Sequence, residues 1–97
     1  MKAIFVNYNQ AYNEEIVELL ESAGERGFTR WDEVQGRGSE SGLPHLGNHA
    51  WPVMNQAVFA VVPDEKVQGI LDALKAKDLE TPDLGLRAFV WNVEQMY

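Results

Sequence analysis

The chain has 97 residues, enough for a single domain over residues 1–97 with one hydrophobic core. Fifteen acidic and eight basic residues give a net charge of −7, which repels nucleic-acid phosphates and anionic lipids. The absence of cysteine excludes disulfides, thiolate nucleophiles and cysteine-based zinc sites. There is neither a signal-peptide pattern nor an apolar run of about 20 residues, so the sequence predicts a cytoplasmic protein without direct membrane insertion.

The first half of the chain predicts a strand, a helix and a second strand. Residues 3–6 form a short apolar run, and the polar residues 7–10 after it indicate a turn. One helical face then carries Ile16, Val17, Leu19, Leu20 and Ala23. We expect Asn13 to cap this helix and Gly24 to end it. Residues 28–34 alternate weakly, which is typical of an edge strand.

The second half predicts a strand, a helix and a last strand. Residues 57–62 are apolar throughout, as in a strand that is buried on both faces. Residues 64–76 repeat apolar positions at helical spacing, and residues 86–93 supply the final strand. The order βαββαβ predicts an α+β, ferredoxin-like fold in which both helices cover one face of a four-stranded antiparallel sheet. Another small α+β fold with the same order of elements would also fit this pattern.

Two helices can cover only one face of such a sheet, yet the first, third and fourth strands carry large apolar residues in both alternating sets. Another copy of the chain is the available cover for the second face. The sequence therefore predicts a homo-oligomer whose sheets face one another.

The long connection over residues 36–55 is rich in glycine and proline and holds both histidines of the chain, His45 and His49. A loop of this length in a small domain is usually functional or disordered. The two imidazoles, with Glu40 or a carboxylate from another subunit, could form a zinc or copper site. Alternatively, both histidines are surface or packing residues. Trp31 and Trp51 suit either a subunit contact or stacking on a ligand.

Gly36, Arg37 and Gly38 follow the second predicted strand. Glycines allow backbone amides to approach an anion and an arginine can bind phosphate, but a tight turn explains the same triplet. Ser39 and Ser41 lie in the same segment as the histidines, without the strand-turn-helix pattern of a nucleophile. The sequence therefore indicates a binding protein and not an enzyme.

The run GFTRWDEVQGRGSESG, residues 27–42, resembles the PII family of signalling proteins. In that family a strand containing Gly-x-Thr leads through Val-x-Gly-x-Gly into a long exposed T-loop. Residues 55–62 are similar to the strand that returns from the T-loop, and the end of the last predicted strand is similar to the family's Phe-Val-x-x-Val-Glu. The family's Gly- and Lys-rich stretch before that strand corresponds here to TPDLGLR, residues 81–87, which has one glycine and no lysine.

The resemblance implies a homotrimer that binds ATP or ADP in clefts between subunits and regulates a partner protein through the T-loop. The effector-binding residues that it implies are Thr29, Gly36, Arg37, Gly38, Gly85 and Arg87. The residues that it implies for partner binding are Ser39, Glu40, Leu43, His45, His49 and Trp51. PII-like proteins that accompany heavy-metal efflux pumps have similarly short chains, so the partner could be a membrane transporter.

A second hypothesis comes from the CutA divalent-cation tolerance proteins, which share the fold and the trimer. Under that hypothesis His45 and His49 bind zinc or copper, and the chain is a metal sensor or a metal-tolerance protein. A plain oligomerisation module is a third possibility, but it leaves the composition of residues 36–55 unexplained.

Overall fold

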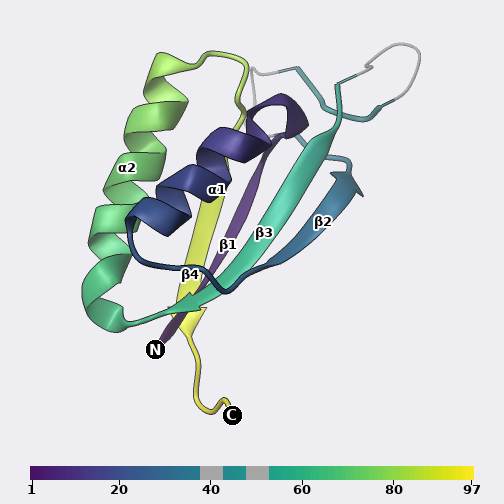
Figure 1. The fold of residues 1–97 in the computed structure, drawn as a ribbon. Coiled ribbons are helices and arrows are strands. Elements are labelled where there is room, and N and C mark those ends of the chain that lie inside the picture. Colours follow the sequence, from purple (N-terminus) through teal and green to yellow (C-terminus); the bar gives the residue numbers. More distant parts are fainter. Residues whose placement is uncertain (38–42, 48–52) are drawn as a thin grey trace.

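The computed structural model describes residues 1–37, 43–47 and 53–97. Its strands are β1 (Lys2–Asn9), β2 (Thr29–Val34), β3 (Asn55–Val62) and β4 (Arg87–Asn92). They form an antiparallel sheet in the order β2-β3-β1-β4. The helices α1 (Asn13–Ser22) and α2 (Val67–Glu80) lie on the same face of the sheet (Figure 1), and each follows a short 3-10 turn, η1 (Gln10–Tyr12) or η2 (Asp64–Lys66). The predicted α+β architecture is confirmed.

The core lies between the helices and the three strands β1, β3 and β4. Its fully buried helix residues are Ile16, Leu20, Ile70 and Leu74, and the sheet contributes Ile4, Val6, Tyr8, Val58, Ala60 and Val62. These sheet residues alternate along their strands, so they all point toward the helices. Burial raises the pKa of Tyr8 to about 12, and its hydroxyl donates a hydrogen bond of 2.5 Å to Asn13 Oδ1.

Two local predictions near the start of α1 are wrong. Of residues 7–10, which were predicted to form a polar turn, residues 7–9 are the last part of β1 and Gln10 begins η1. Asn13 does not cap α1, because its side chain accepts the hydrogen bond from Tyr8. Asn9 is the residue that caps, since its Oδ1 accepts a hydrogen bond from Ala11 N at the beginning of η1.

Neither helix covers the opposite face of the sheet (Figure 1). This face carries aromatic side chains. We call this the open face and define it by Phe5, Trp31, Phe59, Phe89 and Trp91. The ring centroids of Phe5 and Trp31 are 6.1 Å apart, and those of Phe59 and Trp91 are 5.9 Å apart. In the single chain, therefore, the prediction that residues 57–62 are buried on both faces holds fully on the helix side. On the open face it holds for Ala57 but not for Phe59 and Val61, which remain partly exposed.

Candidate functional site

The segment 36–55 is closed at its base by backbone hydrogen bonds. Gly36 N donates to His45 O at 2.9 Å, and His45 N donates to Gly36 O at 2.6 Å. Leu46 forms a bridge with Met54, and Gln35 Nε2 donates to Leu46 O at 2.9 Å. Residues 43–47 therefore lie as a short extended piece between the end of β2 and the start of β3.

His45 has 6% of its surface exposed, so it belongs to the interior of this base. Its Nδ1 lies 2.5 Å from Oδ1 of Asn55, which is also buried. Because an amide oxygen only accepts, this contact requires the proton on Nδ1. The imidazole also packs on Gly85, where an added Cβ would lie 3.1 Å from His45 Cε1. Gly85 has φ +60°, a conformation that favours glycine.

Asn9 ties the connection between α2 and β4 to the same end of the sheet. Its backbone N donates to Leu84 O at 2.9 Å, and its Nδ2 donates to Asp83 O at 3.0 Å. The Tyr12 hydroxyl donates to Asp83 Oδ1 at 2.8 Å, and this hydrogen bond raises the pKa of Tyr12. These contacts hold Gly85 beside the base of the segment 36–55.

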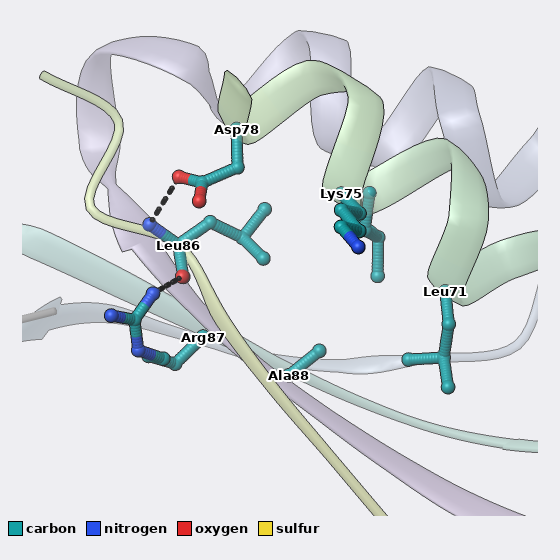
Figure 2. A pocket seen from close by; sticks show the side chains of 7 residues that line it. Leu71, Lys75, Asp78, Leu86, Arg87 and Ala88 are labelled. Atoms are coloured by element: carbon teal, nitrogen blue, oxygen red, sulfur yellow. Dashed lines mark hydrogen bonds between the residues drawn. The ribbon is translucent and has the colours of Figure 1, made fainter. Parts of the chain in front are cut away.

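Arg87 begins β4, opposite Asn7 of β1 in the sheet register. Its Nη1 donates to Leu86 O at 2.8 Å, while Leu86 N donates to Asp78 Oδ1 at 3.1 Å (Figure 2). A pocket of about 230 Å³ lies here, between α2 and the free edge of β4. Arg87 is exposed at this edge, so it is accessible to a bound anion.

Asn7 lies beside both Arg87 and Gly36. It is the partner of Arg87 in the sheet register, and an added Cβ on Gly36 would lie 3.4 Å from Asn7 Nδ2. The same Cβ would lie only 2.5 Å from Asn55 Nδ2, so a side chain at position 36 would displace Asn55. Within the described part of the chain, Asn7 Oδ1 is buried and receives no hydrogen bond. A bound donor group could satisfy this acceptor.

The structure brings four of the predicted effector residues, Gly36, Arg37, Gly85 and Arg87, to the same end of the sheet. Thr29 lies at the other end of β2, seven residues from Gly36, which corresponds to roughly 20 Å along an extended strand. Leu43, one of the predicted partner-binding residues, is 67% exposed. The predicted residues Gly38, Ser39, Glu40, His49 and Trp51 lie outside the described residues.

The predicted metal pair cannot be assembled from the described residues, because only His45 is among them. Its Nδ1 is engaged by Asn55, which leaves Nε2 as the ring nitrogen for any ligand. Across residues 1–37, 43–47 and 53–97, no group of three or more histidine and carboxylate side chains is arranged to hold a metal ion.

Sequence reasoning missed the three asparagines of this site, Asn7, Asn9 and Asn55. Two of them alternate at the end of β1, and the third begins β3 directly opposite Asn9. Polar residues at alternate positions at one end of an otherwise apolar sheet were the available signal. Asn7 and Asn9 instead fall within the polar run that the sequence predicts as a turn, because asparagine is common in turns.

The chain is similar to known proteins in sequence pattern and in fold. The family model described as "Nitrogen regulatory protein P-II" matches residues 1–97. CPII from Thiomonas intermedia K12, a nitrogen regulatory PII-like protein solved with ADP, AMP and bicarbonate, has 21% identity and a TM-score of 0.73, covering 97% of this chain and 88% of that chain. A putative PII-like signalling protein from Thermus thermophilus has 22% identity and a TM-score of 0.68, covering 95% of this chain and 85% of that chain. A direct search of curated protein sequences gives no match.

Proposed function

Because the chain belongs to the nitrogen regulatory protein P-II family, we propose that it is a signalling protein that binds an adenine nucleotide beside the base of the segment 36–55. Binding of this segment to a partner protein then depends on whether the site holds a nucleotide. The observation that carries the proposal is the convergence of Gly36, Arg37, Gly85 and Arg87 at one end of the sheet in a chain of this family. The proposed activity is binding and regulation, without a chemical reaction.

The chemistry of these residues suits a phosphate group. Gly85 and Gly36 have no Cβ, which removes one steric barrier to an anion at their amides. A guanidinium group gives charge-assisted hydrogen bonds to phosphate oxygens, which are stronger than hydrogen bonds between neutral groups. Arg37 and Arg87 are both exposed at this end of the sheet. They would provide local positive charge on a chain whose net charge is −7.

A homotrimer completes the proposal, since the resemblance to PII proteins places effector sites between subunits. The open face supports assembly because it presents a continuous aromatic surface that no element of the described chain covers. Thr29 could then contribute from a different edge of the site than Gly36. We propose a cytoplasmic trimer whose partner is a protein such as a membrane transporter. Among the described residues, no helix is long and apolar enough to span a bilayer.

The ligand class is narrowed by CPII, whose structure contains ADP, AMP and bicarbonate. We propose ADP or AMP as the first candidates here, with bicarbonate as a second anion. TPDLGLR, residues 81–87, has few groups for a triphosphate, with Arg87 as its only basic residue. Tighter binding of ADP than of ATP is therefore expected.

Calorimetric titration of the purified protein with ATP, ADP and AMP, with and without bicarbonate, tests the proposal. Arg87→Ala should weaken nucleotide binding about tenfold or more, because it removes a charge-assisted contact worth about 1.5–3 kcal/mol. Arg26→Ala is the matched control, since Arg26 lies in the exposed connection between α1 and β2. Equal affinities for wild type and Arg87→Ala would remove Arg87 from the site, and no nucleotide binding would contradict the proposed function.

The metal-sensor hypothesis remains a prediction that rests on His45 and His49. It is tested by titrating zinc and copper into wild type and His49→Ala. This variant leaves the buried His45 and its contact with Asn55 intact. Metal affinity that is unchanged by the substitution would exclude the two-histidine site.

A further inference from the structure

One of the amides proposed to bind phosphate is already used by the chain itself. Gly36 N donates to His45 O at 2.9 Å, and the reciprocal bond from His45 N to Gly36 O is 2.6 Å. A backbone N–H has one proton, so Gly36 N cannot make a full hydrogen bond to a ligand while it is paired with His45. The two pairings of this amide exclude each other.

We propose that residues 43–47, called the strap from here on, are a built-in competitor that holds the effector site closed until nucleotide displaces them. This inference rests on the proposed function, because it assigns regulation to the same nucleotide site. While Gly36 N is paired with His45 O, the strap occupies the amide that the ligand would otherwise use. Its release is then the step that connects ligand binding to the segment 36–55.

Both sides of the strap are held by hydrogen bonds to its backbone. On the β2 side, Gln35 Nε2 donates to Leu46 O in addition to the paired bonds of Gly36 and His45. On the β3 side, Leu46 forms a bridge with Met54, and Gly47 N donates to Val53 O at 2.9 Å. Loss of the Gly36 pairing would therefore alter the geometry of a ladder that reaches β3.

The side chain of His45 makes this closure specific. Its ring packs on Gly85, where the three nearest atoms to an added Cβ are all atoms of the imidazole. Its Nδ1 is fixed by Asn55 Oδ1, and the Asn55 amide in turn lies against Gly36. One buried side chain thus contacts both glycine segments of the proposed site. An anion that approached both glycines would meet the imidazole first.

Coupling of this kind is reciprocal. If nucleotide binding opens the strap, then any change that weakens the strap must strengthen nucleotide binding by the same free energy. The expected sign is unusual for a residue inside a binding site, because removing its side chain improves affinity. This sign distinguishes a strap from a ligand-binding histidine.

The test compares the affinity for ADP, measured by calorimetry, in wild type, His45→Ala and Gln35→Ala. His45→Ala should bind ADP about tenfold more tightly or better, since it removes both the Asn55 contact and the packing on Gly85. Gln35→Ala should bind about two- to tenfold more tightly, as expected for the loss of one hydrogen bond. Because Gln35 is exposed, this variant should fold even if His45→Ala does not. Gln68→Ala is the control, since it removes an equally exposed glutamine that bonds to Asp72 on α2, away from the strap.

A second measurement follows the strap without ligand. Hydrogen exchange at the Gly36 amide should be slow in wild type and Gln68→Ala and faster in Gln35→Ala and His45→Ala. Unchanged exchange at the Gly36 amide in both strap variants would overturn the proposed role of the strap, whatever their affinities for ADP. Wild-type binding of ADP with equal or weaker binding in both strap variants would overturn the strap alone. Failure of every variant to bind ADP would overturn the strap and the proposed nucleotide function together.

Discussion

The two faces of the sheet differ sharply although the same strands supply both. On the helix side, Tyr8, Val58 and Val62 have no exposed surface. On the open face, Phe89 is 55%, Trp91 48% and Trp31 46% exposed. The open face nevertheless has the larger side chains. A single chain therefore completes one of its two apolar surfaces and leaves the other for a partner surface, which we propose is the same face of other copies.

The difference between the two faces shows that an apolar residue of the sheet need not be buried within the single chain. Alternation along β1 and β3 assigns each residue to a face, but it does not say what covers that face. Substitutions on the helix side should change the stability of the chain itself. Substitutions on the open face should change its assembly.

The largest effect is expected from truncating the helix-side core. Leu74→Ala removes a fully buried side chain of α2 and should lower the free energy of unfolding by about 2–5 kcal/mol. Urea denaturation followed by circular dichroism measures this change. Leu79→Ala is the control, because Leu79 is on the same helix but 75% exposed and should change stability by less than about 0.5 kcal/mol. Equal losses for the two variants would contradict the assignment of the core.

The next effect concerns the pH dependence of the helix-side core. Burial favours the neutral Tyr8 phenol and raises its pKa from 10.0 to about 12. The contribution of the buried neutral phenol to the free energy of unfolding is therefore complete below pH 10, and it is lost as the pH rises from about 10 through 12. A shift of this size corresponds to about 2–3 kcal/mol.

Tyr8→Phe should remove this part of the alkaline loss of stability. Urea midpoints of wild type and variant, measured between pH 9 and 12, give the difference directly. Tyr12→Phe is the control, because the raised pKa of Tyr12 comes mainly from its exposed hydrogen bond to Asp83. Parallel pH profiles for wild type and Tyr8→Phe would show that Tyr8 ionises like an exposed tyrosine.

The open face gives the third prediction. Trp91→Ser should weaken self-association by about 1–2 kcal/mol per protomer, since roughly half of the indole surface remains to be buried by another copy. Sedimentation equilibrium or light scattering at several concentrations measures the change. Leu79→Ser is the matched control, because it replaces an exposed apolar residue on the helix side. A wild-type protein that stays monomeric at all concentrations would refute the role of the open face.

The fold was predictable because its signals are local. The helical spacing of Ile70 and Leu74 and the apolar run from Ala57 to Val62 each identify an element without knowledge of the rest of the chain. The edge position of β2 followed from its weak alternation.

The site was predictable only in part because its central contacts are not local. The family resemblance predicted Gly36 and Gly85 as site residues. The contact between His45 and Gly85 joins residues forty positions apart in the sequence, so no local sequence pattern could predict it. The turn predicted at Asn7 and Asn9 is wrong because these residues pair with partners on other strands. The burial of His45, which decides whether it is a loop ligand or an interior residue, depends on the same distant contacts.

The smallest effect is expected where the helix side itself ends. Arg30 and Asp32 point to the helix side of β2, but β2 lies beyond both helices (Figure 1), and both side chains are exposed. They form an ion pair with 2.8 Å between Arg30 Nε and Asp32 Oδ1. Arg30→Ala should cost less than about 1 kcal/mol, and the cost should shrink as salt is raised. Urea midpoints in about 50 mM and about 500 mM salt test this, with salt concentrations chosen to change the Debye length roughly threefold. A larger, salt-independent loss would mean that Arg30 is covered in the assembled protein, and that the boundary between the two faces lies beyond β2.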